Sequence, residues 1–295
     1  MKSDVCLLVL GACEGAYALA ASFAGELGVP VTLMDEQITA SLAASALLSP
    51  SRVPGLTLDG IFLRALSDFY AAHVASRCML IPAKDIYAEM TEKHAEYLSR
   101  MFLLPHTLRL PDTPPPQRPE GLLLVYGGRE EETVRTVYGR MVVCAEDGSP
   151  ISLVTEDVPA RLLSALPPHA RGLSLFAVKD GALFPYAERG ALAPQIALSE
   201  AMDASVAEWI LYDWLLCEEP PHVKEGGHAL FTLYPYGWLR RSVREEEKKT
   251  VGRLRARRLV FTLFSRRYEK FPLRGYFGIR RFAREAMERR AARKE

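Results

Sequence analysis

The stretch that decides the fold is VCLLVLGACEGAYALAASFAGELGVPVTLMDE, residues 5–36. Its first six residues are all apolar, as in a parallel strand that is covered on both faces. A turn of small residues follows at 11–15, and then an alanine-rich run over 17–27, with apolar residues at helical spacing, which Gly28 ends. Residues 29–34 predict a second strand. Because a strand, helix and strand in this order cross over right-handed, the stretch predicts a parallel sheet and the α/β class.

The turn after the first strand does not match a dinucleotide-binding fingerprint. That fingerprint is G-x-G-x-x-G, and its middle glycine lets a pyrophosphate approach the helix N-terminus. Here the turn reads GACEGA, with Cys13 in the middle place and Glu14 where a phosphate would sit. Since a negative charge at this point opposes the attraction of the helix dipole for anions, NAD and FAD are disfavoured. Gly11 and Gly15 are expected to let the helix pack closely on the sheet.

Asp35 ends the second predicted strand. In a Rossmann-like fold this place reads a ribose hydroxyl of the cofactor, and a helix-capping role is the alternative. We therefore take Gly11, Gly15 and Asp35 as candidate cofactor-binding residues.

The remaining sequence predicts a boundary and a second unit. Helices are predicted over 61–74 and 85–100 with a buried strand over 78–82, so that a first domain spans 1–105. The stretch DTPPPQRP at 112–119 can continue neither a helix nor a sheet. Beyond it, the following pieces predict an α+β domain over 106–239: strands with hairpin turns at Asp147-Gly148 and Asp180-Gly181, a helix over 196–217, and a strand and turn over 228–238.

Charge is distributed unevenly along the chain. The net charge is +1, but residues 240–295 hold 20 Lys and Arg against 7 Asp and Glu, a charge of +13, and the remainder holds 17 against 29, a charge of −12. We expect this basic, mainly helical tail to dock on the acidic surface of its own chain. Binding to nucleic acid or to an anionic membrane surface is the alternative.

The composition excludes several classes of protein. The five cysteines include no C-x-x-C pair and the six histidines have no metal-ligand spacing, so neither a disulfide framework nor a zinc site is indicated. No run of 18 apolar residues predicts a transmembrane segment, and the first residues do not resemble a signal peptide. A cytoplasmic protein with buried thiols is therefore expected.

Two parts of the chain resemble the ATP-grasp carboxylate–amine ligases, the group that includes D-aspartate ligases. The opening unit and CMLIPAKDIYAEMTEKHAEYLSRMFLLP at 78–105 are similar to the pre-ATP-grasp domain of that family, in which a strand, an Asp (here Asp85), a Tyr and a helix lead to L…P. FTLYPYGWLRRSV at 231–243 and the basic stretch 257–286 resemble its C-terminal end. The resemblance implies that Asp85 belongs to the cofactor-binding residues.

The family phosphorylates a carboxylate with ATP and Mg²⁺, and an amine then attacks the acyl phosphate. FPYAERG at 184–190 stands at the place of the family's Glu-x-Asn-Pro-Arg. The resemblance implies that Arg189 keeps the catalytic arginine, whereas Pro185 and Ala187 stand where the Glu and the Asn belong. Asp180 and Glu188 remain as candidate metal ligands.

The middle of the chain departs from the family. It holds no lysine between Lys93 and Lys179 and is shorter than the lobe that covers the phosphates in these enzymes. Arginine also binds phosphate well. Three arginines are therefore candidates for the ATP phosphates: Arg129, Arg135 and Arg140.

Together these observations predict an α/β protein: a Rossmann-like pre-ATP-grasp domain (1–105), a reduced ATP-grasp-like α+β domain (106–239) and a basic helical tail (240–295). The expected function is ATP-grasp-type ligation of a small-molecule carboxylate or amino acid, weak or absent, with ATP and Mg²⁺ as cofactors if the protein is active and none otherwise. The first alternative is a non-catalytic pseudoenzyme that binds a small ligand, a partner protein or a second copy of itself. The second alternative is that the tail binds an anionic surface or nucleic acid. Of these two partners, nucleic acid is not expected.

Overall fold

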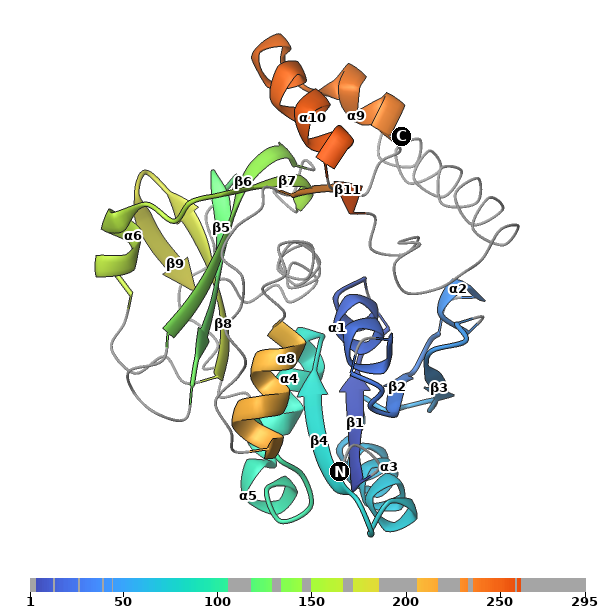
Figure 1. Ribbon diagram of the computed structural model, residues 1–295. Coiled ribbons are helices and arrows are strands. Elements are labelled where there is room, and N and C mark those ends of the chain that lie inside the picture. The colour runs from blue at the N-terminus through green and yellow to red at the C-terminus, as the bar shows by residue number, and fades with distance from the viewer. Residues whose placement is uncertain are drawn as a thin grey trace.

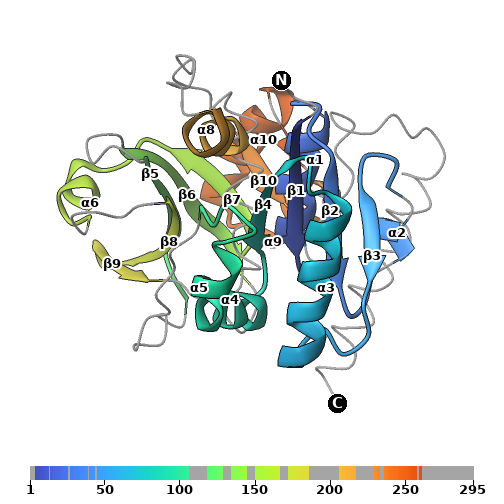
Figure 2. The ribbon, with the colours of Figure 1, turned by 90° about the horizontal axis from the view of Figure 1, so that it is seen from below.

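The computed structural model describes residues 4–105, 118–128, 134–144, 150–166, 172–185, 206–216, 229–232, 236–257 and 259–260, apart from the single positions 13, 26, 39 and 44. Two sheets lie side by side (Figures 1 and 2). One has four strands in the order β3-β2-β1-β4, and the other has seven in the order β11-β10-β7-β6-β5-β8-β9. The first is parallel and the second is mostly antiparallel, which confirms the predicted α/β class.

The parallel sheet begins as the opening stretch predicts. Strand β1 pairs in parallel with β2 on one side and with β4 on the other. The helix predicted over 85–100 divides at His94 into two helices. The elements of this part are β1 (Val5–Leu10), α1 (Glu14–Gly25), β2 (Val31–Asp35), α2 (Ala40–Ala43), β3 (Ser49–Arg52), α3 (Asp59–Ala72), β4 (Arg77–Pro82), α4 (Asp85–Lys93) and α5 (Ala95–Leu98).

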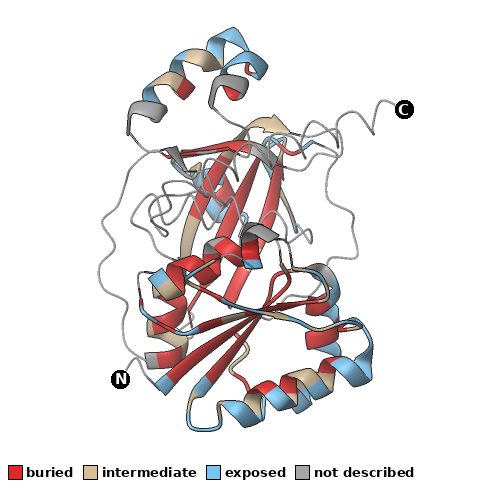
Figure 3. Ribbon diagram, turned by 90° about the vertical axis from the view of Figure 1, so that its right-hand side faces the viewer, coloured by how far each residue is buried: buried red, intermediate tan, exposed pale blue. Residues whose placement is uncertain are grey.

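Both faces of β1 are buried, and this explains its unbroken apolar sequence. Leu7 and Val9 point to one apolar cluster, which includes Phe23 of α1. Leu8 and the other alternate residues point to a second cluster, which includes Phe62 of α3. Helices therefore cover the strand on both sides, as a parallel strand requires. Figure 3 shows the buried strands of this sheet between their helices.

In the antiparallel sheet, β5 lies between β6 and β8, and all of its residues are buried. The predicted hairpin at Asp180-Gly181 joins β8 to β9, and both turn residues have positive φ, of 50° and 74°. The turn predicted at Asp147-Gly148 lies outside the described residues. The elements are β5 (Gly121–Gly127), β6 (Val134–Cys144), β7 (Pro150–Glu156), α6 (Ala160–Ser164), β8 (Gly172–Lys179), β9 (Ala182–Pro185), β10 (Leu230–Thr232) and β11 (Leu259–Val260).

One helical segment joins the cores of the two sheets. It consists of α8 (Val206–Ile210) and the π-helical turn η3 (Leu211–Leu216), and it covers the described part of the helix predicted over 196–217. Trp209 and Leu215 share an apolar cluster with α1 and with Tyr126 of β5. Arg77 at the start of β4 donates a hydrogen bond to the carbonyl of Leu215. The two sheets therefore pack on a common core.

The described part of the basic tail docks on the antiparallel sheet. It comprises the end of α9 (Tyr236–Ser242), α10 (Glu245–Arg257) and strand β11. Leu239 and Val251 pack with Val154 of β7, and Glu247 of α10 pairs with Arg140 of β6. In this described part the contacts are apolar, or they pair an acidic residue of the tail with a basic residue of the sheet. For the rest of the tail, docking on an acidic surface stays a prediction. Residues 261–295 lie outside the description.

Two further predictions meet the structure in part, and a third is not tested by it. Cys6 and Cys78 are buried free thiols, and Cys144 is half-buried, whereas Cys13 and Cys217 are not described. No helix in the described ranges has both the length and the apolar character to cross a membrane. The division into 1–105, 106–239 and 240–295 stays a prediction.

Candidate functional site

The carboxyl edge of the parallel sheet contains a topological switch point. From β1 the chain moves outward to β2 and β3, and it then returns to β4 on the opposite side of β1. The connections that follow β1 and β4 therefore leave in different directions, and open α/β sheets bind ligands at such points. Gly11 follows β1 and Lys84 follows β4. This edge is the candidate site.

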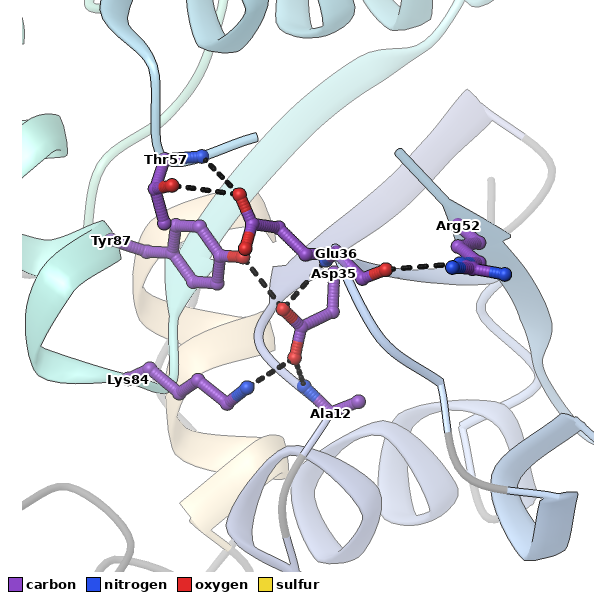
Figure 4. A network of polar contacts seen from close by, with 7 residues as sticks. All are labelled: Ala12, Asp35, Glu36, Arg52, Thr57, Lys84 and Tyr87. Atoms are coloured by element: carbon purple, nitrogen blue, oxygen red, sulfur yellow. Dashed lines mark hydrogen bonds and ion pairs between the residues drawn. The ribbon is translucent and has the colours of Figure 1, made fainter. Parts of the chain in front are cut away.

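Asp35, at the end of β2, is the centre of the site (Figure 4). Its carboxylate Oδ2 accepts hydrogen bonds from the Ala12 backbone N–H at 2.6 Å and from the Lys84 ammonium. Its Oδ1 accepts from the Tyr87 hydroxyl at 2.6 Å and from the Glu36 backbone N–H at 2.7 Å. An ionised carboxylate offers about four acceptor positions. Its own chain therefore fills the acceptor capacity of Asp35.

The negative charge of Asp35 is balanced by the positive charge of Lys84. Burial by itself would raise the pKa of Asp35, which is 2% exposed, but the hydrogen bonds from Lys84, Tyr87 and Ala12 outweigh it and hold the pKa below its usual range. Burial and the neighbouring carboxylate raise the pKa of Tyr87. At neutral pH an anionic Asp35 therefore faces a cationic Lys84 and a neutral tyrosine hydroxyl.

Gly11 allows Lys84 to reach Asp35. The φ of Gly11 is 109°, a conformation that residues with a side chain rarely adopt. A Cβ atom built at Gly11 would stand 2.8 Å from the Cγ of Lys84. The sequence predicts that Gly11 permits close packing of a helix on the sheet. In the structure, the neighbour that needs this space is the stem of Lys84.

Glu36 attaches the end of β2 to the next two segments of the chain. Its carboxylate accepts hydrogen bonds from the backbone N–H of Thr57 at 3.0 Å and from the Thr57 hydroxyl at 2.7 Å. Arg52, the last residue of β3, donates from Nε to the Glu36 carbonyl at 3.1 Å. The loop before α3 and the edge strand are thereby held beside Asp35.

Lys84 is the member of the network that can still bind a ligand. Its side chain is 39% exposed. An ammonium group has three N–H donors, and among the contacts of the described residues one of them is used, toward Asp35. The site therefore offers a partly exposed cation at the switch point. The sequence patterns did not single out Lys84, although it stands two residues after a buried strand, a position similar to that of Asp35 at the end of β2.

The other predicted site residues are distributed over the molecule. Gly15 is the second residue of α1, and Asp85 is the first residue of α4, immediately after Lys84. Asp180 lies at the β8–β9 turn in the antiparallel sheet, away from the switch point in sheet order. Three candidates lie outside the described residues: Arg129, Glu188 and Arg189. Within the described ranges, no three His, Cys, Asp or Glu side chains gather so that they could hold a metal ion.

Arg140, a candidate for the ATP phosphates, is held by two carboxylates. Its Nε donates to Glu156 at 2.5 Å, and Nη1 and Nη2 donate to the two oxygens of Glu247 at 2.7 and 3.1 Å. The hydrogen bond to Glu247 is the main reason why the pKa of Arg140 lies above its ordinary value. In this conformation the guanidinium joins the sheet to α10.

No protein-family model and no curated protein sequence matches the chain. Among solved structures, the chain is similar to an L-amino acid ligase from Bacillus licheniformis, with 9% identity and a TM-score of 0.50 over 77% of this chain and 79% of the ligase. It is also similar to an N5-carboxyaminoimidazole ribonucleotide synthetase solved as an ADP complex, with 8% identity and a TM-score of 0.51 over 77% and 81% of the two chains. Both neighbours are ATP-grasp ligases. The chain therefore has an ATP-grasp-like fold.

Proposed function

We propose that this protein is a relative of the ATP-grasp carboxylate–amine ligases that forms amide bonds weakly or not at all. The likeness to two ligases covers about three quarters of the chain, which supports the general kind of protein. The finer assignment to the D-aspartate ligase group belongs to the proposal. It rests on the sequence stretches at 5–36, 78–105 and 231–286.

The observation that carries the low activity is the pairing of Arg140. A phosphate that used this guanidinium would have to displace Glu156 or both oxygens of Glu247, and charge-assisted pairs of this kind are strong. Pro185, which stands in the place of a carboxylate in the family pattern, ends β9 and has no side-chain oxygen. We infer that binding of ATP phosphates is weak.

The magnesium site belongs to the same proposal. Of its two proposed ligands only Asp180 is among the described residues, and a single carboxylate does not make a magnesium site. If Glu188 completes it, the metal would supply charge neutralisation at the transferring phosphate, and the proposed Arg189 and Arg129 would contact the phosphates rather than the metal. The described residues by themselves do not form this site.

Release of ADP in the presence of Mg²⁺, ATP and a panel of amino acids and small carboxylates tests the proposal. We expect rates at the background level that Glu188→Ala and Arg189→Ala do not lower further. Robust turnover that either substitution abolishes would contradict the weak activity, and would show that the short middle region performs the chemistry of the family.

Lys84 favours a second candidate function, the binding of a small anionic ligand without turnover. We expect ATP, ADP, phosphate or a small carboxylate to raise the melting temperature of the wild type, since a ligand at 100 times its Kd stabilises by about 2.7 kcal/mol. Lys84→Met should abolish the ligand-induced shift. Lys249→Met, at an exposed position on α10, is the matched control and should leave it intact. An equal shift in both variants would place the anion elsewhere.

A further inference from the structure

Two free thiols face each other inside the parallel sheet. Cys6 of β1 and Cys78 of β4 are direct partners in the register of the two strands, and their Sγ atoms lie 2.9 Å apart. Both residues belong to the same apolar cluster, so their side chains point to the same face of the sheet. The chain separates them by 72 positions. The pairing of β1 with β4 is therefore what brings the two sulfurs together.

The backbone at this pair matches what a disulfide requires. Neighbouring strands of a sheet lie about 4.7–4.9 Å apart, and the Cα atoms of bonded cysteines lie about 4.4–6.8 Å apart. Because Cys6 and Cys78 are register partners, a bond between them needs no shift of the strands. The two sulfurs already share a hydrogen bond, so that a small rotation of the side chains is sufficient.

The two thiols are not equivalent. Burial raises the pKa of both, but their mutual hydrogen bond raises the pKa of Cys6 further and lowers that of Cys78. Cys6 is therefore the S–H donor, and Cys78 ionises first. Since the thiolate is the nucleophile in thiol oxidation, Cys78 is the sulfur that attacks an oxidant, and Cys6 is the sulfur that resolves the product.

Residues 73–76, the connection between α3 and β4, lie against Cys78. Its Sγ is 3.8 Å from the carbonyl oxygen of His73 and 3.7 Å from that of Ser76. Both thiols are only 3% exposed, whereas Val74 in this connection is 70% exposed. Exposed connections open locally at a lower free energy than the core of a sheet does. We therefore expect oxidation to be slow and to depend on opening of residues 73–76.

We propose that Cys6 and Cys78 are a modification site at which hydrogen peroxide forms a reversible disulfide between β1 and β4. The Cys78 thiolate attacks one peroxide oxygen, the O–O bond breaks, and the leaving hydroxide takes up a proton, which gives water and a sulfenic acid. The Cys6 sulfur then displaces the hydroxyl group of the sulfenic acid, which leaves with the Cys6 proton as a second water. Two thiols are oxidised and one peroxide is reduced. This site does not depend on the proposed function.

The bond has a consequence for the stability of the parallel sheet. It closes a loop of more than 70 residues, and a crosslink restricts the unfolded chain more when the loop is long. It also fixes the relative positions of the two strands that lead to Gly11 and Lys84. The oxidised protein should therefore resist unfolding better than the reduced protein.

Peptide mapping of the folded, full-length protein tests the site. The reduced protein is treated with hydrogen peroxide, the remaining thiols are blocked, and the chain is digested with trypsin without reductant. We expect a linked pair of peptides that contain Cys6 and Cys78, with the mass of two hydrogen atoms lost, and reversal by dithiothreitol. Because Cys13 shares the tryptic peptide of Cys6, the map is repeated with Cys13→Ser. Free thiols at Cys6 and Cys78 after prolonged treatment, linkage of either to a different cysteine, or a sulfinic acid in place of the link would overturn the proposal.

Melting temperatures test the consequence. The oxidised wild type should melt roughly 5–10 °C above the reduced wild type. Cys6→Ala and Cys78→Ala should both abolish this shift. Cys144→Ala, which removes a half-buried thiol on β6, is the matched control and should keep both the link and the shift. An equal shift in Cys6→Ala would place the modification elsewhere and refute the assignment. If an alanine variant fails to fold, the peptide map of the wild type still decides.

Discussion

Two polar clusters, one around Asp35 and one around Arg135 and Trp209, differ in how many of their hydrogen-bonding groups have a partner in the chain. At the switch point of the parallel sheet, four donors fill the acceptor capacity of Asp35. Between the antiparallel sheet and α8, the guanidinium of Arg135 and the indole N–H of Trp209 are donors without an acceptor among the described residues. In the first cluster Asp35 fixes loops and strand ends and only Lys84 keeps spare donors, whereas in the second cluster both the cation and the indole keep theirs. The two clusters therefore differ in how many of their hydrogen-bonding groups have a partner, although both contain a cation and an aromatic side chain.

The largest effect is expected for the saturated cluster. Asp35→Ala leaves a lysine, a tyrosine hydroxyl and two backbone N–H groups without their acceptor, and it should lower the free energy of unfolding by about 3–5 kcal/mol. Urea denaturation measures this loss. Asp59→Ala, which removes a solvent-exposed carboxylate that binds Lys93 and His94, is the control and should cost much less. Equal losses would show that Asp35 is not a structural centre.

The stability that Asp35 supplies should depend on pH. Because its folded pKa lies below its unfolded value, the contribution is complete above about pH 4 and is lost as the pH falls through the folded value. The difference in unfolding free energy between the wild type and Asp35→Asn should therefore be constant from pH 7 to pH 5 and should shrink below pH 4. Urea midpoints of both proteins over this range provide the measurement. A difference that grows in acid would contradict an ionised, donor-saturated carboxylate.

Gly11→Ala should be the next largest change, with a loss of about 2–4 kcal/mol in the free energy of unfolding. It combines an unfavourable φ with a close contact to the Lys84 stem. Gly28 also has a positive φ, but no atom lies within 4 Å of a Cβ built there. Gly28→Ala should therefore cost only about 1–2 kcal/mol, for the backbone alone. If both variants unfold at the same urea concentration, the close contact between a Cβ at position 11 and the Lys84 side chain does not contribute to the loss.

Arg140 and Glu247 form a saturated pair outside the switch point, and their coupling should be moderate. A double-mutant cycle with Arg140→Met and Glu247→Gln should give a coupling energy of about 1–2 kcal/mol, because the pair is bidentate and mostly buried. The exposed pair of Arg64 and Asp68, at 3.8 Å, should give no measurable coupling. Additive effects at Arg140 and Glu247 would mean that this pair does not hold α10 on the sheet, and that Arg140 is free for phosphate.

The smallest effect is expected at Arg135. Arg135→Met removes a partly desolvated charge and also the contact with the Trp209 ring, so that the free energy of unfolding should change by less than about 1 kcal/mol in the absence of ligand. This result would separate it from Asp35, although both are charged and contact aromatic side chains. Thermal and urea unfolding of the ligand-free proteins give the comparison. A loss as large as that of Asp35→Ala would show that Arg135 is a structural residue.

Local patterns were sufficient for the opening unit. The apolar run of β1, the small-residue turn and the alanine-rich helix predict a strand, turn and helix in a parallel sheet, and each is present. Strand β3 could not be predicted, because SPSR is polar, contains a proline and lies exposed at the edge of the sheet. Its pairing with β2 depends on the position of its neighbour rather than on a pattern of its own.

The sequence by itself determined the α/β class and the position of Asp35 at the end of a buried strand, because both follow from hydrophobic periodicity and chain connectivity over short distances. Only the tertiary structure decided what these residues do. Lys84 and Tyr87 reach Asp35 from 49 and 52 positions away, and Arg135 lies over Trp209, which follows it by more than 70 positions. Saturation of a carboxylate, and the lack of an acceptor for a buried donor, depend on groups that local propensity does not connect. The packing of the two sheets on a common core brings such groups together.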